Sequence, residues 1–488
     1  MTNYLAIDLG AESGRTIVGT LENSVLSLAE THRFSNGPVQ LPDGLHWDVL
    51  RLWTDIQAGI SASAAKFPLA SLAIDTWGVD FALLDRNGAL LGNPYHYRDT
   101  RTDGILDEAF RRVPREQIFA QTGIQFMQIN TLYQLLAMSL QKSPLLEVAQ
   151  TFLTIPDLFN FWLSGKIHCE FTNATTTQCF DPIRRTWALS LLEALDIPTH
   201  ILPPVCEPGT SLGSLLPEVA ENTGAGAIPV IAPACHDTGS AVVAVPAENQ
   251  DFAWISSGTW SIMGCEADRP SVTPQTLDYN FTNEGGVFGS WRLSKNIIGL
   301  WLVQECRRTW RHQGEDLSYD EITRLASEAK PFLAVIDPDD VSFLHPGDMP
   351  ERICQFCVKT SQPIPQTKGE IVRVALESLA LKYRLTLDQL EGLSGKRLDP
   401  IHIIGGGTKN RLLDQLTSDC TGCRVVTGPV EATAIGNLLM QSIALGQLGS
   451  LTDARGVVRK SFNVESYIPG SRAGWDEAYS KLVEMIKG

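Results

Sequence analysis

Two apolar segments of the chain each end in a turn of small residues and continue as a second apolar segment. Residues 4–7 lead into the glycine- and serine-rich turn 10–14, and residues 251–255 lead into the turn 256–259. Two apolar runs joined by such a turn are typical of a β-hairpin. One hairpin near the start of each half indicates two related α/β domains, and a chain of 488 residues is long enough for both.

The polar segment 246–250 is the predicted link between these domains, which we place at residues 1–245 and 246–488. Hydrophobic periodicity predicts a helix over residues 50–66 in the first domain. A second, nearly all-apolar helix is predicted over residues 432–445. We expect the second helix to pack on a sheet and not to form a ligand site.

The glycine turn at residues 10–14 does not match two familiar nucleotide motifs. A dinucleotide site needs G-x-G-x-x-G at the start of a helix, whereas this turn leads into a strand. The G-x-x-x-x-G-K-[ST] sequence of a Walker A loop occurs nowhere in the chain. Both the dinucleotide-binding and the P-loop motifs are therefore excluded.

The formal net charge of −16 restricts the partners that the chain can bind. Nucleic acids and anionic membranes need a basic face, so we expect neither as a partner. The N-terminus has no basic segment before its short apolar run, and no apolar run approaches the roughly 20 residues of a membrane span. With 43% hydrophobic and 19% charged residues, the composition is that of a folded soluble protein, which we expect in the cytoplasm.

The ten cysteines include two closely spaced pairs, Cys354 with Cys357 and Cys420 with Cys423. The stretch between the pairs is much longer than the roughly 15–20 residues of compact zinc modules. We therefore favour free thiols in a reducing compartment over a zinc site.

Asp237 lies between two apolar runs, in the sequence Cys235-His236-Asp237-Thr238-Gly239. A carboxylate is costly to place beside buried segments unless it has a structural or chemical role. It can cap the following helix by accepting free backbone N–H groups. It can also act as a general base that takes a proton from a substrate hydroxyl. Both roles can hold at once, because a helix start keeps a carboxylate ionised, and we favour the base.

Four turns of small residues stand at predicted strand ends, and together they suit a nucleoside triphosphate. They cover residues 10–14, 237–240, 256–259 and 405–407. Small residues let backbone N–H groups approach phosphate oxygens, and the hydroxyls of Ser13 and Thr259 can add donors. Asp8 can hold Mg²⁺ through its water shell, because this ion favours one or two carboxylates plus phosphates. The glycines at 405–407 offer a flat backbone ledge for a purine ring.

The chain resembles the FGGY family of carbohydrate kinases, whose fold is that of the actin-like ATPases. The segments that carry this resemblance are residues 8–15, 236–239, 258–261 and 405–407. Further segments are most similar to the members of the family that act on L-rhamnulose, namely residues 75–81, 97–99, 123–126, 130–134, 172–177 and 283–286. The resemblance implies two ribonuclease-H-like domains, of the actin and hexokinase type of ATPase, which face a central cleft.

The family's roles carry over to individual positions. The resemblance implies a kinase that uses ATP and Mg²⁺ to convert L-rhamnulose to its 1-phosphate, with Asp237 as the base that deprotonates the C1 hydroxyl. Asp8 matches a residue that holds the metal through water. The positions that match sugar contacts are Gly78, His236, Asp237, Thr238 and Asn296. The positions that match ATP contacts are Ala11, Glu12, Ser13, Gly14, Arg15, Thr259, Gln304 and Gly406.

Some of these residues also have a purely structural explanation. Trp77 can simply shape the site, Arg15 can pair with a carboxylate, and residues 172–177 can form a plain loop because Thr and Asn side chains bond locally to the backbone. Residues 130–133 lack the Lys-x-x-Trp of many family members, and only the end of the second family signature is present, at 375–380. Both departures weaken an assignment as a glycerol or xylulose kinase.

Two kinds of alternative remain open. The nearest is a kinase for another ketose, such as L-fuculose or D-xylulose. An alternative from another class is an actin-fold protein that uses ATP as a conformational switch, or a sugar sensor without catalysis. A switch protein of the chaperone type would carry an added peptide-binding domain, and the chain shows no sign of one.

Overall fold

The structure is a computed structural model, and it describes residues 1–487. The chain forms two compact units, each assembled from three separate segments. The first unit contains Met1–Glu248, Glu266–Leu293 and Ala432–Phe462. The second contains Asn249–Cys265, Ser294–Glu431 and the C-terminal segment that begins at Asn463. The chain therefore passes repeatedly from one unit to the other, and the domain division at residue 245 stays a prediction.

Most of the short strands belong to the first unit. Its strands are β1 (Thr2–Leu9), β2 (Ser13–Glu22), β3 (Val25–Ser35), β4 (Pro38–Leu41), β5 (Gly44–Trp47), β6 (Leu69–Thr76), β7 (Phe81–Leu84), β8 (Thr151–Thr154), β9 (Cys169–Glu170), β10 (Phe180–Asp181), β11 (Thr186–Trp187), β12 (Val205–Cys206), β13 (Thr210–Ser214), β14 (Pro229–Ala232) and β17 (Thr282–Gly285). Its helices are α1 (Val49–Ala64), η1 (Thr100–Thr102), α2 (Ile105–Arg112), α3 (Arg115–Thr122), α4 (Thr131–Leu140), α5 (Pro144–Val148), α6 (Ile155–Ser164), α7 (Phe171–Ala174), η2 (Thr175–Thr177), α8 (Leu189–Ala194), α9 (Pro217–Thr223), α10 (Asp237–Val243), α11 (Pro274–Asp278), α17 (Ala432–Ala444) and α18 (Leu451–Ser461).

Longer helices dominate the second unit. Its strands are β15 (Ala253–Ser257), β19 (Ile401–Ile404), β20 (Val425–Thr427) and β21 (Glu465–Tyr467), while β16 (Trp260–Ala267) and β18 (Trp291–Ile298) each contain a boundary between the units. Its helices are α12 (Trp301–His312), α13 (Tyr319–Glu328), η3 (Val341–Phe343), α14 (Met349–Lys359), α15 (Lys368–Ser394), η4 (Gly406–Lys409), α16 (Arg411–Thr421) and α19 (Trp475–Lys487).

The first unit is built on a six-stranded sheet with the order β13-β14-β6-β1-β2-β3. β1 and β2 form the first predicted hairpin, with antiparallel pairing along their whole length. β6 runs parallel to β1, and β14 runs parallel to β6. Parallel strands that are covered on both faces carry continuous apolar runs, which explains the unbroken apolar pattern at residues 4–7.

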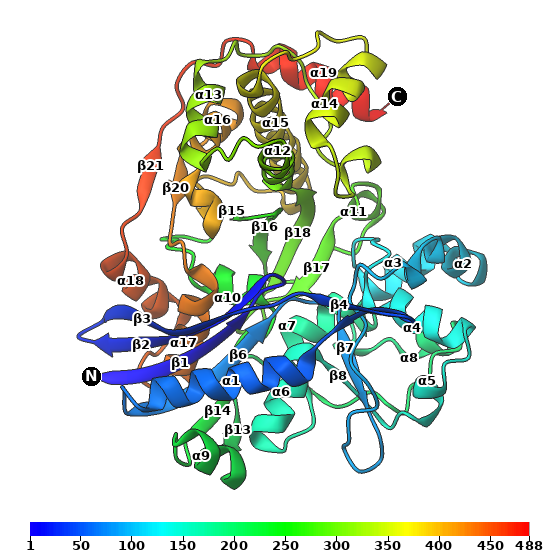
Figure 1. The fold of residues 1–488 in the computed structure, drawn as a ribbon, viewed down its shortest axis with the longest axis vertical. Helices are drawn as coiled ribbons and strands as arrows, with labels where there is room; N and C mark the ends of the chain where they lie inside the picture. Colours follow the sequence, from blue (N-terminus) through cyan, green and yellow to red (C-terminus); the bar gives the residue numbers. More distant parts are fainter. Residues whose placement is uncertain (488) are drawn as a thin grey trace. The chain divides into compact units, whose positions relative to one another are not determined.

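Helices α1 and α17 cover opposite faces of this sheet (Figure 1). A Cβ atom at Gly59 of α1 would overlap the side chain of Thr16 in β2. A Cβ atom at Gly19 of β2 would lie 2.6 Å from Leu438 of α17. Thr16 and Gly19 are three residues apart, so they face opposite sides of the strand. Both predicted helices, at residues 50–66 and 432–445, are thus present and packed on the sheet.

A second sheet has the order β17-β18-β16-β15-β19-β20-β21. β15 and β16 form the second predicted hairpin, and β15, β19 and β20 run parallel to one another. The run β16-β15-β19-β20 thus repeats the run β2-β1-β6-β14 of the first sheet. The repeated order is that of a ribonuclease-H-like sheet and confirms the predicted α/β fold class.

One expected loop proved to be helical. Residues 172–177 are buried and form most of α7 and all of η2, because Glu170 accepts the first free N–H groups of this segment. All ten cysteines are free thiols, with Cys354 and Cys357 on α14. Within residues 1–487, no helix has both the length and the apolar composition that a membrane span requires.

Candidate active site

Two carboxyl groups lie side by side at one edge of the first sheet. Asp8 on β1 and Asp75 on β6 are register partners in adjacent parallel strands, so their side chains leave the same face. Asp237 begins α10 shortly after β14, and a β-bridge between Thr76 and His236 joins this turn to the end of β6. The sheet therefore brings the predicted metal residue and the predicted base to the same edge.

The two oxygens of Asp237 have different surroundings. Oδ1 accepts the backbone N–H and the hydroxyl of Thr238 and lies 3.4 Å from His236 Nε2. Oδ2 accepts no hydrogen bond from residues 1–487, and the side chain is 32% exposed. Asp237 therefore satisfies one free N–H of the helix start and keeps one oxygen available. Asp237 is the first residue of α10, whose N-cap is His236, so it starts the helix without being its cap, and its geometry is compatible with a role as a base.

Asp75 is buried and is oriented by α17. Its Oδ2 accepts a hydrogen bond from Asn437 Nδ2 at 2.6 Å, and Asn437 Oδ1 accepts one from Gln441 Nε2 at 2.7 Å. Gln441 Oε1 accepts in turn from Ser71 Oγ at 2.7 Å. Burial and the nearby charge of Asp8 raise the pKa of Asp75 well above its usual value. A protonated Asp75 would limit the negative charge beside Asp8.

The α7–η2 segment supports two of the predicted sugar-binding turns. Thr172 Oγ1 accepts the backbone N–H of His236 at 3.1 Å and donates to Glu170 Oε2 at 2.6 Å. A Cβ atom at Gly78 would lie only 3.0 Å from Thr176 Oγ1. The segment therefore holds the Gly78 turn and the His236 turn in a fixed relation within the first unit.

Asp80 fixes the turn that contains Gly78. Its Oδ2 accepts hydrogen bonds from Trp47 Nε1 at 2.6 Å and Trp77 Nε1 at 3.0 Å. Its Oδ1 accepts from Gln134 Nε2 at 2.9 Å. Burial raises the pKa of Asp80 to about 6, although these donors favour the charged form. Trp77 thus has a structural role in shaping this turn.

The predicted first phosphate loop is the turn between β1 and β2. Gly10 donates its N–H to the carbonyl oxygen of Ser13 at 2.9 Å, and residues 11–12 occupy the turn between them. A Cβ atom at Gly14 would overlap the ring of Phe34, so glycine is required for the close packing of this loop. The loop is thereby held tightly at the strand ends.

Arg15 forms an ion pair with Asp8. Its Nη2 and Nε lie 2.8 Å and 3.0 Å from Asp8 Oδ2, and the two residues are direct partners in the hairpin. The pair orients the Asp8 carboxylate. Arg15 therefore does pair with a carboxylate, as its structural explanation requires. Its predicted contact with ATP stays a prediction.

The predicted nucleotide residues of the second unit surround the ends of β15 and β19. The carbonyl oxygen of Thr259 accepts the first N–H of α12 at 3.1 Å, which places Gln304 in the first turn of a helix that starts at this hairpin. A Cβ atom at Gly407 would overlap the side chain of Ser257. The glycine loop after β19 therefore packs directly on the hairpin turn, with Gly406 exposed.

The predicted residues are thus divided between the two units. The first unit holds Asp8, Ala11, Glu12, Ser13, Gly14, Arg15, Gly78, His236, Asp237 and Thr238. The second unit holds Thr259, Asn296, Gln304 and Gly406. In each unit they gather mainly at the ends of parallel strands, which is where ligands bind in open α/β sheets.

The side chains around Asp8 fit Mg²⁺ in part. This ion takes oxygen ligands and is usually bound by one or two carboxylates together with waters and substrate phosphates. Asp8 and Asp75 are adjacent, and Asp75 Oδ1 is a buried oxygen without a hydrogen-bond partner in the described structure. No group of three His, Cys, Asp or Glu side chains within residues 1–487 is arranged as a metal site. Protein ligands would therefore hold only part of the coordination shell.

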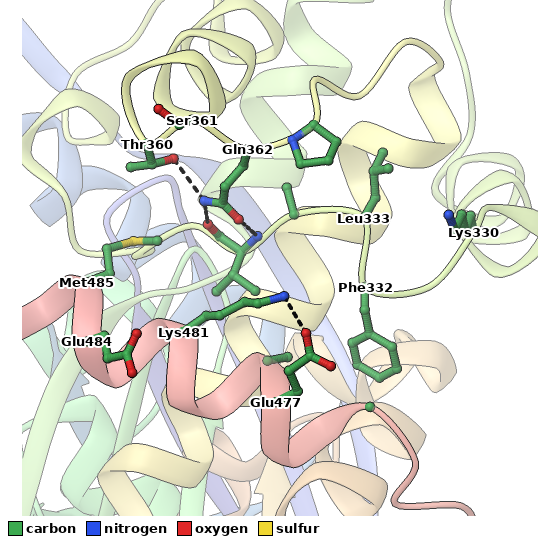
Figure 2. A pocket seen from close by; sticks show the side chains of 15 residues that line it. Lys330, Phe332, Leu333, Thr360, Ser361, Gln362, Glu477, Lys481, Glu484 and Met485 are labelled. Atoms are coloured by element: carbon green, nitrogen blue, oxygen red, sulfur yellow. Dashed lines mark hydrogen bonds and ion pairs between the residues drawn. The ribbon is translucent and has the colours of Figure 1, made fainter.

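A cavity of about 820 Å³ lies elsewhere in the second unit (Figure 2). It is lined by α19 and by the loops at residues 330–335 and 360–363. Lys481 and Glu477 form an ion pair of 2.8 Å at its wall. None of the predicted site residues lines this cavity, so we assign it no part in the active site.

The sequence reasoning missed several polar groups that organise the site. Arg292 donates to His236 Nδ1 at 3.1 Å, and in the sequence it stands between the apolar residues Trp291 and Leu293 at the start of β18. A charged residue that is buried needs a partner, and its apolar neighbours gave a usable signal that it could be buried. Asn437 and Gln441 are four residues apart on an apolar helix and therefore share one face, which was a second signal.

Comparisons with known proteins show which chains are similar to this one. The model of the FGGY family of carbohydrate kinases, N-terminal domain, matches residues 3–244, and that of the C-terminal domain matches residues 253–445. A protein of Bacteroides thetaiotaomicron named rhamnulokinase is 43% identical over 486 residues, which cover 99% of both chains. A protein of Bacillus subtilis with the same name is 39% identical over 467 residues, which cover 96% of this chain and 95% of the relative.

Solved structures share the fold. Ligand-bound xylulose kinase from Lactobacillus acidophilus superposes with a TM-score of 0.83 at 18% identity, covering 100% of this chain and 98% of the other. Plasmodium falciparum glycerol kinase with ADP gives a TM-score of 0.81 at 17% identity, covering 99% and 98%. At these identities the similarity establishes the two-domain fold alone.

Proposed function

Because the chain belongs to the FGGY family of carbohydrate kinases, we propose that it transfers the γ-phosphoryl group of ATP to the C1 hydroxyl of L-rhamnulose. The substrate is supported by relatives named rhamnulokinase, which are 39–43% identical over nearly the whole chain. The six segments that resemble kinases acting on this sugar support the same choice. The product is L-rhamnulose 1-phosphate, and the second product is ADP.

The geometry of Asp237 carries the proposed mechanism. Oδ1 is held by Thr238, while Oδ2 accepts no hydrogen bond from the described residues and belongs to a partly exposed side chain. Oδ2 takes the proton of the C1 hydroxyl as this oxygen forms a bond to the γ-phosphorus. The bond from the γ-phosphorus to the bridging oxygen breaks at the same time, and ADP leaves with that oxygen.

The sugar is held by the turns that the α7–η2 segment supports. His236 and Thr238 flank the base, and Gly78 lies on the adjoining turn, where a Cβ atom would press against Thr176. Asn296 on β18 is a further proposed contact to the sugar. Hydrogen bonds from such groups orient a hydroxyl for attack, and positioning supplies much of the rate in phosphoryl transfer.

The proposed ATP contacts are those that the family resemblance implies. They are residues 11–15 in the first unit, and Thr259, Gln304 and Gly406 in the second. Mg²⁺ near Asp8, held through water, would neutralise phosphate charge when bound. Arg15 keeps the Asp8 carboxylate in place for that contact.

We also propose that the reaction takes place in the cytoplasm. All ten cysteines are free thiols, and such thiols persist in a reducing compartment. ATP is available in the same compartment.

The base is tested by Asp237→Asn, which keeps the shape of the side chain but cannot take the proton. We expect kcat to fall by about 10²–10⁴-fold, because that is the usual contribution of general base catalysis. Calorimetric affinity for ATP and the unfolding midpoint should stay close to the wild-type values. Asp196→Asn, at an exposed ion pair with Arg112, is the control for loss of a charge. Near-normal turnover of Asp237→Asn would mean that Asp237 only starts the helix.

The substrate is tested by identifying the phosphorylated product by ³¹P NMR after incubation with ATP, Mg²⁺ and single ketoses. We expect the highest kcat/KM for L-rhamnulose and a phosphate on C1. A clear preference for L-fuculose or D-xylulose would overturn the choice of sugar. ATP hydrolysis without any sugar phosphate would indicate a conformational switch, and sugar binding without turnover would indicate a sensor.

A further inference from the structure

A buried ion pair lies directly behind His236 in the first unit. Glu284 on β17 and Arg292 on β18 are joined by a contact of 3.0 Å between Arg292 Nη2 and Glu284 Oε2, and their side chains are 10% and 1% exposed. Arg292 Nε also donates to the carbonyl oxygen of Gly285 at 2.9 Å. The guanidinium is therefore held in place by two groups of its own hairpin.

The same guanidinium determines which nitrogen of His236 carries the hydrogen. Arg292 Nη2 lies 3.1 Å from His236 Nδ1 in hydrogen-bond geometry. A guanidinium can only donate, so Nδ1 must accept and the hydrogen of the neutral ring is on Nε2. Glu284 Oε2, 3.3 Å from Nδ1, would favour the opposite arrangement, but a hydrogen on Nδ1 would face the N–H of Arg292.

The charges of the pair are consistent with this arrangement. Burial would raise the pKa of Glu284, but the charge of Arg292 opposes it, and the pKa of this carboxyl lies below its usual value. Burial lowers the pKa of Arg292, while the carboxylates of Glu284 and Asp237 raise it. An arginine side chain stays protonated in proteins, so Arg292 remains a donor.

We propose that Arg292, held by Glu284, is a positioning residue that keeps the hydrogen of His236 on Nε2 and directs it toward Asp237 and the sugar. Nε2 lies 3.4 Å from Asp237 Oδ1. The N–H group at His236 Nε2 therefore faces Asp237 Oδ1, which also accepts from Thr238. Asp237 Oδ2 remains available to take the proton of the C1 hydroxyl. This inference rests on the proposed kinase activity, because Asp237 needs such orientation only as a base.

The direct test is the tautomer of His236, measured by ¹⁵N NMR on the whole protein with labelled histidine. The His236 signal is identified by its absence in His236→Gln. We expect a protonated Nε2 and an unprotonated Nδ1 in the wild-type protein. A hydrogen on Nδ1 would overturn the proposal, whatever the activity of the protein and whatever any variant does.

The second test is the double variant Glu284→Gln/Arg292→Met, which removes both charges and leaves none unpaired in the interior. We expect mixed tautomers of His236 and a fall in kcat of about 10–100-fold, the range that misplacement of a reacting group can cause. The affinity for ATP should not change. Wild-type kcat with Nε2 still protonated would overturn the proposal.

The matched control is a largely buried pair on α15 of the second unit, Arg373 with Glu377, at 2.6 Å. Glu377→Gln/Arg373→Met removes the same two charges from the other unit, and we expect wild-type kcat and an unchanged His236 signal. An equal loss of kcat in both double variants would reduce Arg292 to a general structural role and overturn the proposal. If the wild-type protein phosphorylates no ketose, the proposed function fails, while the tautomer measurement still decides this inference.

Discussion

Buried carboxyl groups in this protein differ in how many hydrogen-bond donors surround them. Asp80 accepts hydrogen bonds from two indole N–H groups and a side-chain amide, and burial raises its pKa only to about 6. Asp414 on α16 is equally buried, and neither of its oxygens has a hydrogen-bond partner in the described structure. Burial and the charge of Glu465 raise the pKa of Asp414 to about 8. Missing donors therefore account for the larger shift.

The raised pKa of Asp414 predicts that the free energy of unfolding depends on pH. In the unfolded chain this carboxyl loses its proton near pH 3.8, whereas in the folded protein it keeps it up to about pH 8. The folded state thus binds more protons between these values, so its stability falls as the pH rises, by at most about 1.4 kcal/mol per pH unit. Asp414→Asn cannot titrate and should lack this contribution.

The measurement is the free energy of unfolding of both proteins, by urea denaturation, at several pH values. We expect the stability of Asp414→Asn relative to wild type to increase from pH 4 to pH 8 and to level off above that. A difference that does not change with pH would mean that Asp414 titrates alike in both states. Other titrating groups cancel in the comparison.

At the scale of elements, the helices α10 and α17 pack closely against each other in the first unit. A Cβ atom at Gly436 of α17 would overlap the carbonyl oxygen of Ser240 in α10. The contact also brings Asn437 near enough to orient Asp75. The apolar pattern of residues 432–445 predicted a packed helix correctly. Only the structure showed that Asn437 and Gln441 of this helix bond toward Asp75.

Gly436→Ala should therefore destabilise the protein, although alanine is the better helix former. We expect a loss of about 1–3 kcal/mol, the usual cost of overpacking. Gly392→Ala on α15 is the matched control, because a Cβ atom there would meet nothing within 4 Å. The control should gain up to about 1 kcal/mol from helix propensity. Thermal or urea unfolding of both variants measures this, and equal effects would contradict the close contact.

At the scale of the whole molecule, the two units are not consecutive pieces of chain. The first sheet is covered on one face by α17, which comes from residues 432–444, nearly two hundred residues after the first segment ends at Glu248. Tyr4 reaches Ser442 of this helix, and Gln441 donates to the carbonyl oxygen of Leu5 at 3.0 Å. The core of the first unit therefore depends on the far end of the sequence.

This arrangement predicts that residues 1–248 do not fold alone. Without α17 the apolar face of β1 and β6 would be exposed, which favours aggregation. We expect the fragment to be insoluble or to unfold without a cooperative transition by circular dichroism, and co-expression with residues 249–488 to restore a soluble complex. A fragment that unfolds cooperatively at the temperature of the full chain would contradict the prediction.

Local patterns in the sequence determined much of this protein. The hairpins at residues 10–14 and 256–259, the helices at 50–66 and 432–445 and the position of Asp237 at a helix start all follow from neighbours in the chain. Periodicity, turn residues and capping are interactions over a few residues, so they can be read without a fold. The motifs shared with the family extended these predictions to the residues of the candidate site.

Only the tertiary structure decided how distant polar groups are paired. The contact of Arg292 with His236 joins residues 56 apart, and that of Asn437 with Asp75 joins residues 362 apart. No local pattern encodes such a pairing, because it depends on which strands and helices pack together. A buried polar group must find a partner wherever the fold provides one. The sequence therefore predicted the base, and the fold selected the polar groups that surround it.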